Sequence, residues 1–280
     1  MKLEKNRQFE YNFNKIADNH PRLDYYELTY TAVDNSKIYA EVMVPKGQAR
    51  GLFIEIPDYK AFPKDYLNLG RYAILDYAVA SLHVRGQVGQ SENRQPASIY
   101  FPFLNNQKDE LYYNFVYQDA IDLVVVLKKE FPGLEINVLG IGQGASVGLV
   151  AAAVTKDIER LFISNAQNID FETIFKENAD VGIYEAIRDY NRNFPQKEDY
   201  MLDCLSEIDI LNYAKEVEAQ VYYGYSHLNV RTPKKCQDKL LELLPNKEII
   251  HYRKFEHEVL QEHFFDEFVL KKIERIVNGV

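Results

Sequence analysis

The chain has 280 residues, 46% hydrophobic and 27% charged, a balance that excludes a disordered or fibrous protein. Its 42 acidic and 33 basic side chains give a net charge of −9, which argues against a broad surface for nucleic acid or anionic lipid. Two cysteines, an N-terminus without a secretory signal and no apolar run of membrane-spanning length predict a soluble, cytoplasmic protein without a membrane partner.

The N-terminal part of the chain predicts an antiparallel hairpin. Two runs of alternating polar and apolar residues, 25–32 and 37–44, flank the turn residues Asp34 and Asn35. Apolar runs without alternation follow, a pattern typical of strands buried on both faces of a parallel sheet. These runs are 51–56, 77–82, 136–140, 160–164, 220–224 and 248–252.

Segments with helical periodicity lie between these runs, at 119–129, 145–154, 233–244 and 262–277. The alternation predicts an α/β fold, most simply a doubly wound, mostly parallel sheet with an N-terminal antiparallel hairpin. A (β/α)₈ barrel is the alternative, but too few regular units are visible for it. Without repeats or linkers, we expect a single domain, 1–280. Residues 87–117 lack a regular pattern and are rich in aromatic side chains, which predicts an irregular excursion. This excursion forms either a functional site or an interface, or its aromatic rings simply anchor the loop on the core.

A glycine cluster follows the run 136–140 and predicts a tight turn from a strand into a helix. Gly140, Gly142 and Ala145 fit a relaxed dinucleotide-binding fingerprint, but the motif comes late in the chain and no acidic residue ends the next strand. Gly140 and Gly144 also fit the outer positions of the G-x-S-x-G nucleophile elbow, whose central residue needs a positive φ that glycine adopts at little cost. A turn that only packs the helix on the strand is the third interpretation.

Further segments match one family in order and spacing. They are Pro57-Asp58-Tyr59, His83-Val84-Arg85-Gly86-Gln87-Val88-Gly89, Tyr112-Tyr113, Asp119-Ala120, Asp209 with Asn212, and Phe255-Glu256-His257-Glu258. From about residue 25 to the C-terminus the chain resembles the cephalosporin-C deacetylase and acetyl xylan esterase family of α/β-hydrolases. The family's motifs at the first, second and last of these segments are H-G-Y, D-x-R-G-Q-G and G-H-E. The resemblance implies a Ser-His-Asp esterase for small acetylated sugars and similar esters, which assembles as a homo-oligomer and uses no cofactor.

The family's catalytic roles, carried over by position, give a degenerate site. Gly142 takes the nucleophile position, His227 the acid position, and His257 is the retained general base. The resemblance also implies that the backbone N–H groups of Tyr59 and Gln143 form the oxyanion hole. Because glycine has no oxygen to attack a carbonyl and the acid is replaced by histidine, we expect a catalytically impaired homologue, a pseudoenzyme, with a pocket for a ligand or partner.

Asp58 replaces a glycine of the family's first turn and would oppose a developing oxyanion if its side chain pointed inward. Two other functions remain open. One is an active ester hydrolase with a relocated nucleophile, for which Ser164 and Ser226 lie at strand ends, or with a water activated by His257. The other is a structural subunit that uses the aromatic excursion as its interface.

The sequence predicts no metal site. The histidines and carboxylates near the C-terminus lack an i, i+4 histidine pair on one helix face. They are His251, His257, Glu258, Glu262 and His263. Cys204 and Cys236 have no motif context, so we expect buried, inert thiols.

Overall fold

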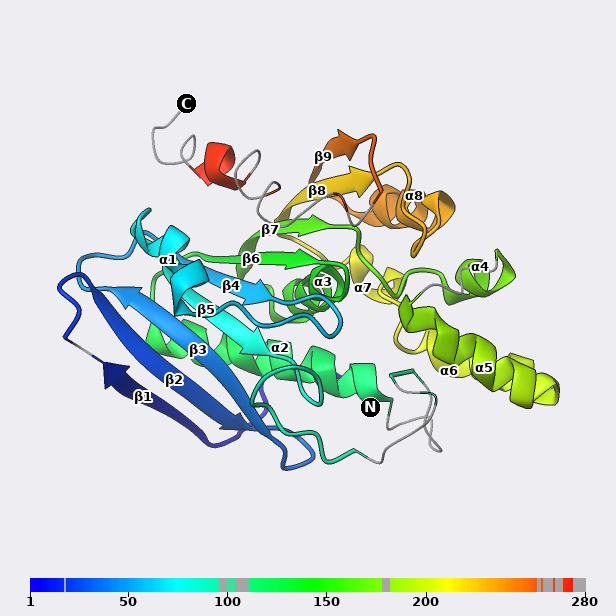
Figure 1. The fold of residues 1–280 in the computed structure, drawn as a ribbon, viewed down its shortest axis with the longest axis horizontal. Coiled ribbons are helices and arrows are strands. Elements are labelled where there is room, and N and C mark those ends of the chain that lie inside the picture. The colour runs from blue at the N-terminus through cyan, green and yellow to red at the C-terminus, as the bar shows by residue number, and fades with distance from the viewer. Residues whose placement is uncertain are drawn as a thin grey trace.

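The structure is a computed structural model that describes residues 1–17, 19–95, 100, 102–103, 111–177, 182–255, 258, 264 and 269–273. Its described strands form one sheet in the order β1-β2-β3-β5-β4-β6-β7-β8-β9 (Figure 1). The strands are β1 (Tyr11–Ala17), β2 (Leu23–Thr31), β3 (Lys37–Pro45), β4 (Leu52–Ile56), β5 (Ala78–His83), β6 (Ile136–Ile141), β7 (Ile158–Ser164), β8 (Gln220–Ser226) and β9 (Lys247–Tyr252).

The sheet combines an antiparallel edge with a parallel body. β1, β2 and β3 pair antiparallel, and β3 pairs antiparallel with β5. From β5 through β4 to β9, every neighbouring pair is parallel. The predicted fold class, a doubly wound and mostly parallel sheet with an N-terminal antiparallel hairpin, is confirmed. β1 is an additional edge strand whose polar, partly exposed sequence gave no strand signal.

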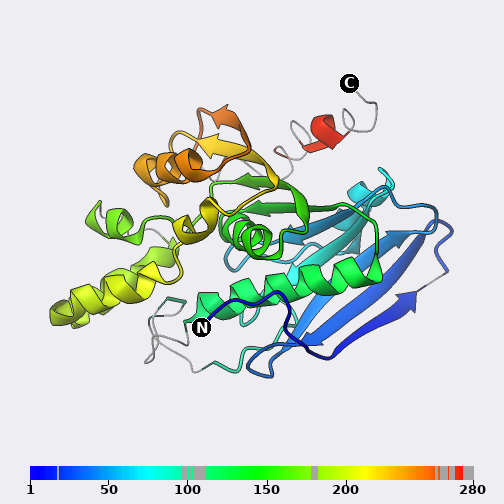
Figure 2. The same ribbon diagram turned by 180° about the vertical axis from the view of Figure 1, so that it is seen from behind.

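Helices cover both faces of the sheet, α2 and α3 on one face and α1 on the other (Figures 1 and 2). The helices are α1 (Tyr66–Ala73), α2 (Tyr112–Glu130), α3 (Gln143–Thr155), α4 (Phe171–Lys176), α5 (Glu185–Asn193), α6 (Glu198–Ser206), α7 (Leu211–Ala214) and α8 (Lys234–Leu243). Most of the predicted helix 262–277 falls outside the described residues. Within the described ranges, no helix has both the length and the apolar character needed to cross a membrane.

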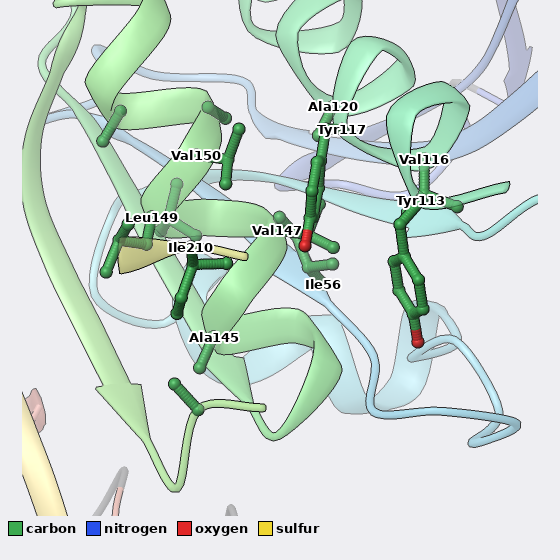
Figure 3. Packing of buried hydrophobic residues seen from close by; sticks show 14 of the residues in the cluster. Ile56, Tyr113, Val116, Tyr117, Ala120, Ala145, Val147, Leu149, Val150 and Ile210 are labelled. Atoms are coloured by element: carbon green, nitrogen blue, oxygen red, sulfur yellow. The ribbon is translucent and has the colours of Figure 1, made fainter. Parts of the chain in front are cut away.

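The core between the sheet and its helices is built around α2 and α3 (Figure 3). Tyr117 and Ala120 of α2 lie toward Val147 and Val150 of α3, and all four are buried. The small side chains of α3 let it approach the sheet closely, since a Cβ at Gly148 would lie 2.7 Å from Val138 Cγ1. This packing fixes the start of α3, which follows the glycine cluster.

One part of the predicted irregular excursion is wrong. Residues 112–117 are not irregular, because α2 begins at Tyr112. The helix is buried on almost every side through its first four turns, so its sequence lacks the polar face that normally reveals a helix. Residues 96–99, 101 and 104–110 of the excursion lie outside the described residues.

Candidate functional site

The turn between β6 and α3 has the backbone conformation of a strained elbow. Gly142 has φ 58° and ψ −117°, and its N–H donates to Ser164 O at 3.0 Å. The positive φ expected at this position is confirmed, and side chains with a Cβ adopt it only with strain. Gly144 is required for a different reason: a Cβ there would lie 2.0 Å from the carbonyl oxygen of Ile56. The elbow is therefore pressed against the end of β4.

The Asp58 carboxylate lies directly beside Gly142. A Cβ at Gly142 would be 2.2 Å from Asp58 Oδ1 and 2.6 Å from Asp58 Cγ, far inside van der Waals contact. The carboxylate thus fills the space that a side chain at the elbow would enter. Asp58 comes from the turn after β4, so the end of this strand and the elbow after β6 meet at the carboxyl edge of the sheet.

Four donors hold this carboxylate. The backbone N–H groups of Tyr59 and Gln143 donate to Oδ1 of Asp58 at 2.8 and 2.9 Å. The side-chain amide of Gln167 donates to the same oxygen at 3.2 Å. Arg231 Nη1 donates to Oδ2 at 3.1 Å. The two N–H groups assigned to the oxyanion hole therefore converge on one oxygen of the chain itself, and their role toward a substrate stays a prediction.

The electrostatic environment favours an anion at this place. The carboxylate accepts from the N-terminus of the 13-residue helix α3, where the helix dipole contributes positive potential. Arg231 adds a full positive charge and a charge-assisted hydrogen bond. The side chains of Asp58 and Arg231 are 26% and 36% exposed, so the site can be reached from solvent.

A buried amide network sets the position of Gln143. Its Oε1 accepts from Gln87 Nε2 at 2.7 Å and from the Tyr113 hydroxyl at 3.1 Å, while its Nε2 donates back to Gln87 Oε1 at 3.2 Å. Gln87 also donates to the Tyr112 hydroxyl, which donates to the Arg85 carbonyl. Residues of two family motifs, the segment after β5 and the tyrosine pair of α2, therefore support the first turn of α3.

An ion pair in the interior anchors the segment after β5. Arg85 is fully buried and donates to both carboxylate oxygens of Asp119 at 2.6 and 2.7 Å, and to Asp34 at 2.8 Å. Burial raises the pKa of the Asp119 carboxyl to about 6, and the Arg85 guanidinium works against this rise. Arg85 follows β5 and Asp119 lies in α2, so the pair fixes the segment that contains Gln87, a hydrogen-bond partner of Gln143, to α2.

Gln167 belongs to the loop that follows β7, in which three residues have left-handed backbone conformations. Asn165, Asn168 and Asp170 all have positive φ, a conformation that Asn and Asp tolerate better than other residues with a Cβ. Ser146 of α3 receives the N–H of Gln167 at 2.8 Å and donates to its carbonyl at 2.6 Å. The hydroxyl of Ser146 is therefore committed to the loop, and Gln167 is held where its amide reaches Asp58.

The residue at the acid position turns toward the edge of the sheet. His227 follows β8, and its Nε2 lies 3.1 Å from Nδ1 of His251 on β9. Its ring also contacts the Tyr225 ring, at a centroid distance of 5.1 Å. His257 lies outside the described residues, so the roles assigned to His227 and His257 stay predictions. From this same loop, Arg231 is the residue that reaches Asp58.

The remaining candidates are buried. Ser164 and Ser226 end β7 and β8 with exposed fractions of 0% and 1%, and no partner for their hydroxyl groups is found in the described part of the chain. Cys204 and Cys236 are free and buried, and burial raises the pKa of the Cys236 thiol to about 12. Among the described residues, no three His, Cys, Asp or Glu side chains are placed to hold a metal ion.

Sequence reasoning missed two residues of this site, Gln167 and Arg231. Neither belongs to a motif, and each lies in a loop whose path the sequence does not reveal. The sequence carries a signal for Asp58 but none for these two residues. Relative to the family pattern, position 142 has lost a side chain and position 58 has gained one. Two such changes, in the segments assigned to the elbow and the oxyanion hole, indicate that the side chain of Asp58 fills the space left at position 142.

Comparison with known proteins identifies acetyl xylan esterases both by sequence and by structure. The family model for acetyl xylan esterase matches residues 1–273. An acetyl xylan esterase from Paenibacillus sp. R4 superposes with a TM-score of 0.85 at 20% identity, covering 96% of this chain and 89% of that one. Acetyl xylan esterase 1 from Thermoanaerobacterium sp. JW/SL YS485 gives 0.83 at 18% identity, covering 95% and 90%. The acylaminoacyl peptidase of Pyrococcus horikoshii gives 0.62 at 15% identity, covering 97% and 42%. A search of curated proteins finds no significant match.

Proposed function

The chain belongs to the acetyl xylan esterase family, and from this premise we propose that it is a pseudoenzyme: an α/β-hydrolase homologue without the serine-esterase reaction, whose site holds its own carboxylate. The observation that carries the proposal is the position of Asp58. Its Oδ1 accepts both backbone N–H groups assigned to the oxyanion hole. It also fills the space in front of Gly142.

Two requirements of ester hydrolysis fail at this site. Acyl transfer needs a nucleophile, and Gly142 supplies none; loss of the serine alone costs on the order of 10⁶ in kcat in a serine protease. It also needs donors free to bind the developing oxyanion, and each such donor is worth about 10² to 10³ in kcat. Here the donors are already engaged, and a negative charge lies where the oxyanion would form. Ordinary serine-esterase turnover is therefore not expected.

The proposal restricts what the site can bind. A small acetylated ligand, the class implied by the resemblance, would have to displace the Asp58 carboxylate to place its carbonyl oxygen in the hole. A role in the cytoplasm and assembly as a homo-oligomer remain part of the proposal. A structural subunit that assembles with an active relative is compatible with the same site, and recovery of such a relative by co-purification from the native source would support it.

Labelling with a fluorophosphonate probe tests the proposal, because the probe reacts with serines activated as nucleophiles. We expect no labelling of the native protein under conditions in which an active serine esterase is labelled fully. A label that disappears after heat denaturation and maps to one serine would contradict the proposal.

A relocated nucleophile is the second candidate, favoured by the hydroxyl groups of Ser164 and Ser226, for which no hydrogen-bond partner is found in the described part of the chain. Both residues end strands at the sheet edge that carries the elbow. A label mapped to either serine would select this candidate, and Ser164→Ala or Ser226→Ala should then remove the label. A turnover without any label, lost in His257→Ala, would instead indicate a water activated by His257.

A further inference from the structure

We propose that the four donors around Asp58 form a receptor for small monocarboxylates of the size of formate and acetate, in which the Asp58 side chain is the resident ligand. This inference rests on the proposed function, because a serine at position 142 would occupy the same space. It adds the chemical class that the site accepts and an autoinhibitory role for Asp58.

The donor set has the composition of a carboxylate site rather than of a chance contact. Three donors meet on Oδ1 of Asp58: two backbone N–H groups, which only proline substitutions would remove, and the side-chain amide of Gln167. Arg231 binds the other oxygen, so both carboxylate oxygens are engaged. Gln167 is 1% exposed, and the 3.2 Å hydrogen bond from its Nε2 to Asp58 Oδ1 shows that this buried amide is directed into the site, while its Oε1 finds no partner in the described part of the chain.

The charge balance favours an anion once the Asp58 carboxylate is absent. The Asp58 carboxylate now lies between the Arg231 guanidinium and the N-terminus of α3, and both contribute positive potential. Without this carboxylate, the positive potential at the site would favour binding of another anion. The exposure of Asp58 and Arg231 gives a path from solvent.

The size of the ligand follows from the size of the side chain it replaces. Beyond its Cα, aspartate is a methylene group and a carboxylate, the heavy atoms of acetate. Asp58→Gly therefore leaves a space of acetate size, and Asp58→Ala, which keeps the Cβ, leaves a space of formate size. In the wild type the tethered carboxylate acts at an effective concentration on the order of millimolar or higher, so an external carboxylate competes poorly.

Isothermal titration with acetate and formate, at constant ionic strength with chloride as the reference anion, tests the receptor. We expect Asp58→Gly to bind acetate at least about 30-fold more tightly than the wild type does. Asp58→Ala should prefer formate to acetate, while Asp58→Gly should bind acetate at least as well as formate. This reversal of preference is the critical result, because unspecific anion binding would give both variants the same order.

Two control variants separate the receptor from general charge effects. Adding Arg231→Gln to Asp58→Gly should weaken acetate binding by about tenfold or more, the loss of one charge-assisted hydrogen bond. Asp189→Ala removes a carboxylate from the exposed pair of Asp189 and Arg192, and should create no anion site. Equal binding by Asp58→Ala and Asp189→Ala would overturn the proposal.

Folding of the variants is followed by circular dichroism in the same titrations. A variant that is unfolded alone should recover its folded signal with its matched anion, and no recovery at about 100 mM would overturn the proposal. The outcomes also separate the two proposals. If the variants bind their matched anions but the wild type shows esterase turnover, the receptor stands and the proposed function is wrong. If the wild type is inactive and the variants bind no anion, the proposed function stands and the receptor is wrong.

Discussion

The backbone nitrogen of Gln143 lies 2.9 Å from Oδ1 of Asp58. In an α/β-hydrolase the N–H that follows the nucleophile stabilises the oxyanion of the substrate, and here the same N–H stabilises a carboxylate of the chain. The Asp58 carboxylate lies where a side chain at position 142 would be, so these two positions compete for one space. This relationship leads to the predictions that follow.

The first prediction concerns the coupling of Gly142 and Asp58. Gly142→Ser should lower the free energy of unfolding by about 2–4 kcal/mol, because it adds backbone strain at a φ of 58° and pushes the Asp58 carboxylate from its donors. In an Asp58→Gly background the same substitution should cost at least about 1 kcal/mol less, since the collision is gone. Urea denaturation of the four proteins of this cycle measures the coupling, and additive costs would show that the two positions do not share the space.

The second prediction concerns the buried pair of Arg85 and Asp119. Asp119→Asn should lower the free energy of unfolding by about 3–5 kcal/mol, because it leaves the Arg85 guanidinium charged and only partly compensated in the interior. Glu172→Gln breaks the exposed pair of Glu172 and Lys176 and should cost no more than about 0.5 kcal/mol. Urea midpoints compare the two variants. Similar small costs would mean that Arg85 gains its stabilisation elsewhere.

The sequence was sufficient for most of the sheet and for the elbow. Each of the six apolar runs became one of the strands β4 to β9, because strands buried on both faces have few polar residues. The elbow could be predicted because a positive φ restricts the residue type at Gly142. β1 could not, since this edge strand is held by its pairing with β2 more than by its own composition.

Other parts of the fold and site depend on tertiary contacts. Leu67 of α1 and Ile74, the residue that caps the C-terminus of this helix, are 88% and 84% exposed, so the pattern of polar and apolar residues is misleading here. One of the four donors that hold the Asp58 side chain is Arg231, which is 173 positions away in the chain. A contact at that separation follows from the path of the loop after β8, which no local sequence rule gives.

The third prediction concerns pH and His83. Burial lowers the pKa of His83 from 6.5 to about 4, and its Nδ1 accepts the N–H of Gln90 at 3.1 Å. Glu41, 4.0 Å away, is too distant for a hydrogen bond that would offset the burial. Between pH 6.5 and 4 the unfolded chain binds a proton that the folded chain does not, so His83 lowers stability as the pH falls through this range.

The expected loss of unfolding free energy from this residue between pH 8 and pH 5 is about 2 kcal/mol. His83→Asn keeps an acceptor near Nδ1 and removes the titration, so its stability should fall less over the same range. Urea midpoints of both proteins at the two pH values measure the difference. An equal fall in both would show that other groups cause the acid sensitivity.

The fourth prediction concerns repair of the esterase site. Gly142→Ser with His227→Asp places a serine and an aspartate at the positions assigned to the nucleophile and the acid, but leaves the Asp58 carboxylate on the two N–H groups assigned to the oxyanion hole. Addition of Asp58→Gly should therefore raise p-nitrophenyl acetate turnover by about 10² or more over the double variant. Equal turnover of the double and triple variants would show that Asp58 does not block the site, provided that both are folded by circular dichroism.

The most direct test of the central proposal is p-nitrophenyl acetate turnover by the unmodified protein, compared with the His257→Ala variant. If the Asp58 carboxylate occupies the oxyanion hole of a site without a nucleophile, both proteins should show the same rate, close to that of buffer with an unrelated protein. A turnover above about 1 s⁻¹ in the wild type that is lost in His257→Ala would contradict the proposal, because such a rate lies in the range of working enzymes.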